Sequence, residues 1–160
     1  MEFLKVLDDD KNELSKKVER GKKLNEGEHI LLAIIIIKNS NNKYLIQKTS
    51  KQKGDCYAFT GGHILYNETS REGIIREVKE ELGIKVNKPT YITDIKLGIP
   101  FMDIYYLKKD IKKDELKLQK EEVESIEFLS KEEILNLIKK GKLRQSHYKA
   151  FDKFLKLQKD

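Results

Sequence analysis

The chain contains little cysteine, proline, tryptophan or arginine: its 160 residues include one cysteine, two prolines, no tryptophan and four arginines. The single cysteine, Cys56, excludes an internal disulfide framework and is typical of a reducing cytoplasm, the location we expect. The longest apolar run, residues 30–37, is far shorter than the roughly 20 residues of a membrane-spanning helix, so we expect no membrane partner. The N-terminal segment has no apolar stretch after a basic start, and no signal peptide is expected.

Charge is plentiful, and most of the cations are lysines. Lys+Arg number 33 and Asp+Glu number 27, which gives a formal net charge of +6. Proteins that read nucleic acids tend to use arginine, because its guanidinium makes bidentate contacts. Lysines scattered among glutamates are more typical of a solvated surface. We therefore expect no nucleic-acid partner.

Apolar periodicity changes irregularly between that of strands and that of helices, which predicts an α/β (α+β) fold with a mixed sheet. No repeat or linker interrupts the sequence, so we expect one domain over residues 1–160, with residues 1–28 as an N-terminal extension. The run 30–37 predicts a buried central strand, and 43–48 predicts the second arm of its hairpin. Further strands are predicted at 3–7 (an edge strand), 57–59, 91–97, 101–107 and 125–129, and helices at 69–82, 131–140 and 146–157.

The last predicted helix is amphipathic. Tyr148, Phe151 and Phe154 lie on one side, and lysines lie on the other. Basic amphipathic helices bind membranes or partners in some proteins, but we expect this one to pack on the domain or to form a homodimer contact. His147 is expected at the surface or at the helix cap, and His29 at the end of the central strand.

Three carboxylates gather in the predicted helix 69–82. At about 100° per residue, Glu77, Glu80 and Glu81 share one face. They lie near the helix C-terminus, where the helix dipole and their mutual repulsion are unfavourable, and such a local conflict marks a candidate functional site. Oxygen ligands without several histidines or cysteines suit Mg²⁺ or Mn²⁺. Gly73, one turn earlier, is expected to leave room above the carboxylates.

The alternative is a solvated acidic face whose charge is balanced by neighbouring bases. Arg71, Arg76 and Lys79 lie in the same helix. Arg76 also precedes Glu80 by four residues, a spacing at which ion pairs stabilise helices. The surrounding segment favours the functional interpretation.

Residues 62–84 resemble the Nudix box, the pattern G-x5-E-x7-R-E-U-x-E-E-x-G-U in which U is apolar. Every fixed position matches, with Gly62, Glu68, Arg76, Glu77, Val78, Glu80, Glu81, Gly83 and Ile84 in register. The flanking pattern extends the likeness over most of residues 28–157. The resemblance to the Nudix (MutT-like) superfamily implies an αβα sandwich with a mixed sheet and a loop-helix-loop catalytic motif.

The resemblance also implies an activity. It predicts a hydrolase that cleaves the diphosphate linkage of a nucleoside diphosphate derivative or a similar small molecule with Mg²⁺ or Mn²⁺. By this likeness Glu77, Glu80 and Glu81 are metal ligands, and Gly61 or Gly62 offers a backbone carbonyl, with Gly61 the assigned residue. The general base is left open, because it differs within the family.

Supporting residues follow from the same likeness. Arg76 is expected to orient a carboxylate, as groups behind a metal site do, and Glu68 to assist directly or through water. A further metal ligand is expected downstream. Its candidates are Glu121, Glu122 and Glu124, with Glu122 the assigned one, and the alternative for each is a solvated charge.

A second likeness relates residues 17–63 to the isopentenyl-diphosphate isomerase-like branch of the superfamily. Isomerases of this branch have a catalytic cysteine before a Gly-His pair, whereas Gly61 occupies that place here and Cys56 lies too early to replace it. His63 is a candidate for contact with metal or phosphate. The likeness implies an isomerase-like scaffold with a hydrolase site. An isomerase of an allylic diphosphate and a non-catalytic nucleotide sensor are the alternatives.

Overall fold

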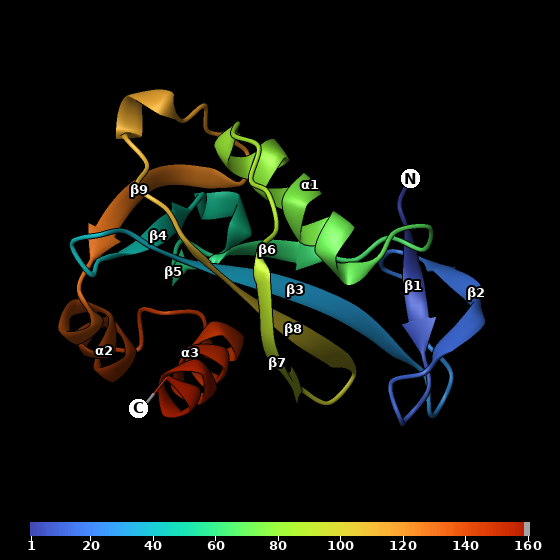
Figure 1. The fold of residues 1–160 in the computed structure, drawn as a ribbon. Helices are drawn as coiled ribbons and strands as arrows, with labels where there is room; N and C mark the ends of the chain where they lie inside the picture. Colours follow the sequence, from blue (N-terminus) through green and yellow to red (C-terminus); the bar gives the residue numbers. More distant parts are fainter. Residues whose placement is uncertain (159–160) are drawn as a thin grey trace.

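The computed structural model describes residues 1–158, in which nine strands belong to one mixed sheet (Figure 1). The strands are β1 (Phe3–Leu7), β2 (Glu13–Glu19), β3 (His29–Lys38), β4 (Tyr44–Thr49), β5 (Tyr57–Ala58), β6 (Thr60–His63), β7 (Thr90–Lys96), β8 (Pro100–Lys108) and β9 (Val123–Leu129). The helices are α1 (Ser70–Leu82), α2 (Lys131–Lys139) and α3 (Gln145–Leu157), with 3₁₀ turns at Lys51–Lys53 and Lys113–Glu115. No helix in this described range is long and apolar enough to cross a membrane.

Strand β3 is the central element of the sheet. One of its sides pairs in parallel with β8 along the whole strand. Three strands share the other side in turn: β1 near the start, β6 in the middle, where Ile34 pairs with Gly61, and β4 at the end, where Lys38 pairs with Tyr44. The predicted buried central strand is thus confirmed, and β6 leads into α1 from the middle of the sheet.

Two predicted pairings differ from the structure. The hairpin between 30–37 and 43–48 forms only at its base, because β6 occupies the side of β3 that a longer hairpin would need, and β4 pairs instead with β9 and β5. The prediction of an edge strand at 3–7 is wrong, since β1 lies between β2 and β3. β2 was not predicted because its sequence, ELSKKVE, has no apolar alternation.

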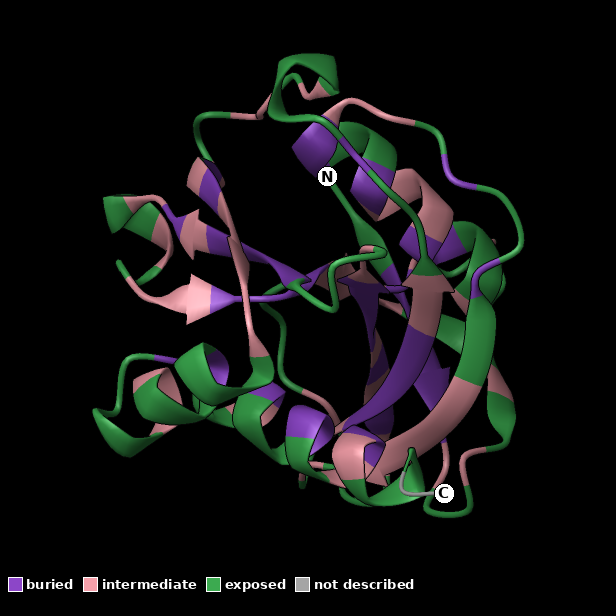
Figure 2. Ribbon diagram, turned by 60° about the vertical axis from the view of Figure 1, so that its left-hand side comes forward, coloured by how far each residue is buried: buried purple, intermediate pink, exposed green. Residues whose placement is uncertain are grey.

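Alternate residues of β3 face opposite sides of the sheet and divide the core in two. One cluster includes Ala33, Ile35, Ile74, Val78 and Leu82, which joins β3 to α1. The other includes Ile34, Ile36, Ala150, Phe151 and Phe154, which joins β3 to α3. Figure 2 shows the buried strands between these helices. The predicted αβα sandwich is confirmed, and α3 packs on the domain.

Helix α1 begins and ends where its sequence signals indicate. The side chain of Thr69 accepts a hydrogen bond from the N–H of Glu72 over 3.1 Å, and the side chain of Glu72 accepts one from the N–H of Thr69 over 2.8 Å. This capping box fixes the first turn. Gly83 ends the helix in the left-handed region, at a φ of 75°. The two caps set the rotation of α1 and hence the direction of its glutamates.

Candidate active site

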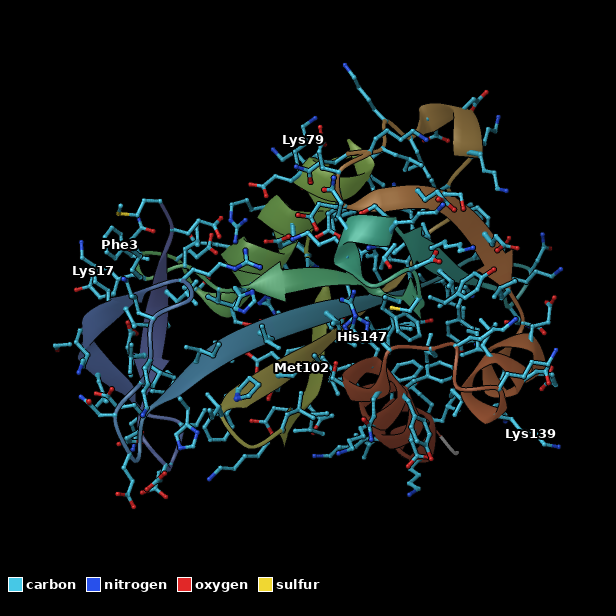
Figure 3. All side chains as sticks on the ribbon, turned by 180° about the vertical axis from the view of Figure 1, so that it is seen from behind. Phe3, Lys17, Lys79, Met102, Lys139 and His147 are labelled. Atoms are coloured by element: carbon cyan, nitrogen blue, oxygen red, sulfur yellow. The ribbon has the colours of Figure 1, made fainter. Side chains whose placement is uncertain are left out.

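A cavity of about 290 Å³ lies between α1, the central strands and the start of α3. Glu77, Glu80 and Glu81 of α1 line it, together with Ser146 and His147 of α3. In Figure 3, His147 lies between the start of α3 and the strands. The structure therefore brings the three predicted carboxylates together with residues from the far end of the sequence.

Glu81 is deeply buried, with 4% of its surface exposed. Nε2 of Gln47, on β4, donates to Oε1 of Glu81 over 3.0 Å, and the hydroxyl of Thr60, on β6, donates to Oε1 of Gln47 over 2.9 Å. A carboxyl oxygen that carries no proton only accepts hydrogen bonds, so the amide turns its NH₂ group to Oε1 of Glu81 and its oxygen to Thr60. These two bonds fix the orientation of the Glu81 carboxylate.

Glu81 and Glu77 hold protons more tightly than a free glutamate does. Burial is the main cause that raises the pKa of Glu81, and the hydrogen bond and repulsion from Glu77 raise it further. Burial also raises the pKa of Glu77, although its contacts with Glu81 and Arg76 act in the opposite direction. Two adjacent carboxylates, one buried and one half-buried, favour a proton on one of them, unless a cation replaces that proton.

Arg76 connects the carboxylates of the site. Its Nη2 lies 2.7 Å from Oε1 of Glu68, and its Nη1 lies 2.9 Å from Oε1 of Glu77 and 3.2 Å from Oε1 of Glu80. Nη2 also donates to the carbonyl oxygen of His63 over 3.1 Å, which links α1 to the end of β6. The hydrogen bond to Glu68 is the main cause that raises the pKa of Arg76, so the guanidinium stays charged. The structure thus places Arg76 and Glu68 beside the predicted ligands.

The glycines of the segment 61–73 are required by close packing. A Cβ at Gly62 would lie 2.6 Å from the Cδ of Glu77, and a Cβ at Gly61 would overlap the carbonyl oxygen of Ala33. The expectation for Gly73 is wrong: its hydrogen faces Ile64 and Glu68, where a Cβ would come within 2.8 Å of Oε1 of Glu68. Gly73 therefore allows α1 to pack on the loop before it, and it does not lie above the three carboxylates.

Of the other predicted residues, some line the cavity and some lie elsewhere. His63 and Glu122 line the cavity, and Glu122 lies 3.2 Å from Nζ of Lys53. Burial lowers the pKa of His63 to about 4, so its ring is neutral near pH 7. Glu124 instead lies 3.9 Å from Nζ of Lys48. His29 is the first residue of β3, a strand-end position as predicted, and its Nε2 lies 2.7 Å from Oδ1 of Asp9.

Two residues of the cavity were not recognised in the sequence. The expectation of a surface position for His147 is wrong, because 5% of its surface is exposed and it lies within α3. Gln47 had a usable signal: it follows Leu45 by two residues in an alternating strand and so shares its inward face. A polar side chain on a buried face needs a partner, and that partner is Glu81.

The donor set suits a hard divalent cation. In residues 1–158 no three His, Cys, Asp or Glu side chains are arranged to hold a metal ion. Arg76 contacts Glu77 and Glu80, and Gln47 contacts Glu81. Nonetheless these three carboxylates line one cavity, and oxygen is the ligand that Mg²⁺ and Mn²⁺ prefer. Added positive charge would be most favourable beside the buried Glu81 and its half-buried neighbour Glu77. The residues present therefore fit such a cation.

Comparisons with known proteins bear on the family and the fold of this chain. A model of the NUDIX domain matches residues 28–154. An uncharacterised Nudix hydrolase of Listeria innocua is 35% identical over 138 residues, which cover 81% of this chain and 80% of that protein. A crystal structure of a protein from Deinococcus radiodurans superimposes with a TM-score of 0.74 at 20% identity and covers 88% of this chain and 91% of the other. A MutT protein from Methanosarcina mazei has a TM-score of 0.66 at 20% identity, over 82% and 96% of the two chains.

Proposed function

The chain belongs to the NUDIX family of hydrolases, which act on pyrophosphate bonds, and on this basis we propose that it cleaves the diphosphate linkage of a nucleoside diphosphate derivative or a similar small molecule by attack of water at phosphorus. Nudix hydrolases generally use divalent metals, and we propose Mg²⁺ or Mn²⁺ here. The observation that carries the proposal is the pair of Glu81, which is buried, and Glu77, which is half-buried, in a cavity shared with Glu80 and bordered by Gly61. A diphosphate is anionic, so this acidic wall would repel it without a cation between them.

The proposed roles follow from the contacts. Glu77, Glu80 and Glu81 would hold the cation, with the backbone carbonyl of Gly61 and the side chain of Glu122 as further ligands. When bound, such an ion neutralises phosphate charge and lowers the pKa of water. The remaining contacts belong to the chain itself: Arg76 orients carboxylates, Glu68 anchors Arg76, and Gln47 and Thr60 hold Glu81. Beside the ion, His63 would contact phosphate as a neutral ring.

The structure gives a reason to prefer hydrolysis to isomerisation. An isomerase of the related branch would need a cysteine where Gly61 stands. A Cβ at Gly61 would overlap the carbonyl oxygen of Ala33 and lie 2.9 Å from Cα of Ile34, so no cysteine fits on this backbone. Cys56 lies elsewhere, with its Sγ 3.7 Å from Oγ1 of Thr49. The retained carboxylates likewise favour an enzyme over a nucleotide sensor.

We also propose that residues 1–160 act as one cytoplasmic domain, without a nucleic-acid partner. The N-terminal extension supports the single domain, because β1 and β2 join the same sheet as the segment matched by the NUDIX model. Glu2 and Arg20 of the extension also line the cavity. A homodimer contact of α3 stays a prediction, to be measured by sedimentation.

A substrate screen tests the proposed function. Nucleoside diphosphate derivatives, dinucleotides, sugar nucleotides and isoprenoid diphosphates are each incubated with the protein and Mg²⁺, and substrates and products are separated by chromatography. We expect turnover of at least one nucleotide class and loss of turnover when EDTA is added. Isomerised allylic diphosphate without hydrolysis would instead support the alternative, and inactivity with the whole panel would contradict the proposal.

Removal of the Thr60 hydroxyl is expected to lower activity through Glu81. Thr60→Val keeps the shape but leaves the Gln47 oxygen without its donor, so the amide is free to turn from Glu81. We expect kcat about tenfold lower and a higher Mg²⁺ requirement, since a misplaced ligand costs on the order of 1.4 kcal/mol of transition-state stabilisation. Thr60→Ser should restore both values. Steady-state kinetics over a Mg²⁺ titration measure this, and equal kinetics for the Val and Ser variants would show that Thr60 does not position Glu81.

A further inference from the structure

His147 is enclosed in the first turn of α3, yet it borders the cavity. The backbone N–H of Phe59 donates to its Nδ1 over 3.0 Å. The His147 ring also lies beside the Phe59 ring, with centroids 6.3 Å apart. Figure 3 shows the side chain directed from α3 toward the strands. The residue before β6 therefore holds this imidazole in one orientation.

The contact with Phe59 determines which ring nitrogen carries the proton. Nδ1 of His147 accepts a hydrogen bond, so the hydrogen of the neutral ring is on Nε2. Burial, together with the charge of Arg144, lowers the pKa of His147 to about 3, and the ring stays neutral near pH 7. The Nε2–H group is therefore a permanent donor.

Within residues 1–158 no acceptor is found for this donor. In the described part of the chain, every side-chain nitrogen or oxygen that is fully buried has a hydrogen-bond partner. The hydrogen bond found for the His147 ring comes from Phe59 and uses Nδ1, so Nε2 is not one of these fully buried atoms. Nε2 therefore borders open space. The open space that His147 lines is the cavity shared with Glu77, Glu80 and Glu81.

The start of α3 adds donors beside His147. Arg144 is the N-cap residue but makes no capping bond with its side chain, and the first turn of α3 contains no acidic residue. The first N–H groups of a helix need acceptors and carry partial positive charge. Arg144 and Ser146 line the same cavity, and Arg144 donates to the carbonyl oxygen of Lys53 over 3.0 Å. The carboxylate of Glu122, which also lines the cavity, pairs with Lys53.

We propose that His147 and the start of α3 form a substrate subsite that binds an oxygen acceptor, supplied by a nucleobase carbonyl or by a further phosphoryl group. This inference rests on the proposed function, because it places the two ends of one substrate on two walls of one cavity. The α1 wall meets the diphosphate through a cation, and the His147 wall donates hydrogen bonds to another part of the molecule. A neutral donor recognises an acceptor without requiring a charge, so His147 acts on substrate choice.

Two substitutions separate the donor from the structural contact. His147→Asn places an amide oxygen near the position of Nδ1, which keeps the acceptor for Phe59 but removes the donor to the cavity. His147→Gln places an amide near the position of Nε2, which keeps the donor but leaves the Phe59 N–H unpaired. Binding is measured by calorimetry with three non-hydrolysable probes: α,β-methylene UDP, α,β-methylene ADP and methylenediphosphonate, each with Mg²⁺.

We expect His147→Asn to bind the probes about three- to tenfold more weakly than wild type, and His147→Gln to bind nearly as wild type does. In urea unfolding we expect the opposite order, with His147→Gln the less stable variant. Weakening confined to the UDP analogue identifies a base carbonyl as the acceptor, and weakening of all three probes identifies phosphoryl oxygen. Equal binding by Asn and wild type, weaker binding by Gln alone, or no binding of any probe to the wild type at millimolar concentration would overturn the subsite. Because binding is measured without turnover, an inactive screen and a failed subsite are distinguishable.

Discussion

Replacement of Glu81 by glutamine is expected to lower kcat by about 10³-fold or more while leaving the fold intact. Glutamine keeps the size of the side chain but removes the negative charge that the proposed cation requires. The loss of one such ligand removes several kcal/mol of transition-state stabilisation, and each 1.36 kcal/mol changes the rate about tenfold. Glu77→Gln should have a similar effect. The measurement is kcat on a substrate found in the screen, at saturating Mg²⁺, with Glu26→Gln as a control because Glu26 is exposed and outside the cavity.

The same Glu81→Gln variant makes a prediction about stability. The pKa of Glu81 is raised above its ordinary value of 4.5, so the folded protein retains a proton that the unfolded chain releases. The free energy of unfolding of the metal-free wild type should therefore fall as the pH rises above about 4.5. Glutamine does not titrate, so the free energy of unfolding of the variant should fall less steeply with pH. At pH 8 it should equal or exceed that of the wild type. Urea unfolding in EDTA between pH 5 and 8 measures both slopes.

Two results would contradict the role of Glu81. Normal turnover by both glutamine variants would remove the metal assignment. Parallel stability profiles for wild type and Glu81→Gln would show that Glu81 carries no raised pKa in the folded protein. The unfolding curves also show whether a variant with low activity has kept its fold.

Local signals in the sequence were sufficient to predict α1 and much less informative about pairing in the sheet. The Thr69 capping box and Gly83 define α1 through contacts within a few residues. The partner of β4 depends instead on β9, which comes much later in the chain, and on the arrival of β6 beside β3. An alternating pattern indicates a strand but carries no information about its neighbour, and the predicted hairpin is therefore confirmed only at its base, where Lys38 pairs with Tyr44.

The candidate site shows the same division between local and distant contacts. Glu77, Glu80 and Glu81 were predictable together because a helix repeats every 3.6 residues or so, at about 100° per residue. Gln47 and His147 reach the cavity from β4 and α3, and only the folded sheet brings them there. Both α1 and α3 line the cavity because they pack on the two faces of one sheet. A motif confined to residues 62–84 contains no information about α3.

Alanine at Gly62 is expected to lower activity and alanine at Gly61 to lower stability, although the two positions are adjacent. A Cβ at Gly62 would meet the carboxylate of Glu77, with 2.6 Å to Cδ and 2.7 Å to each oxygen. The end of a side chain moves readily, so stability should change by less than about 1 kcal/mol. Displacement of a proposed ligand should, however, lower kcat by about 100-fold, because a misplacement of about 1 Å has effects of that size.

At Gly61 the obstacle is backbone in the middle of the sheet. A Cβ there would overlap the carbonyl oxygen of Ala33 and approach Cα of Ile34, on the strand with which β6 pairs. Backbone between paired strands cannot yield without loss of their hydrogen bonds, so Gly61→Ala should lower the free energy of unfolding by about 3 kcal/mol or more. Urea unfolding of the two alanine variants measures this difference, and equal destabilisation would contradict the distinction.

A double-mutant cycle tests whether Gly62 acts through Glu77. Glu77→Asp shortens the side chain by one methylene, which relieves the contact with the methyl group that Gly62→Ala introduces but also withdraws the carboxylate. If the clash is the cause of the lost activity, the double variant should lose less than the product of the two single losses, because both changes act on one contact. Independent, multiplicative losses in kcat would show that Gly62 serves the site in another way, such as through the geometry of its own backbone. The cycle thereby separates the space that glycine leaves for a ligand from the conformation that glycine permits.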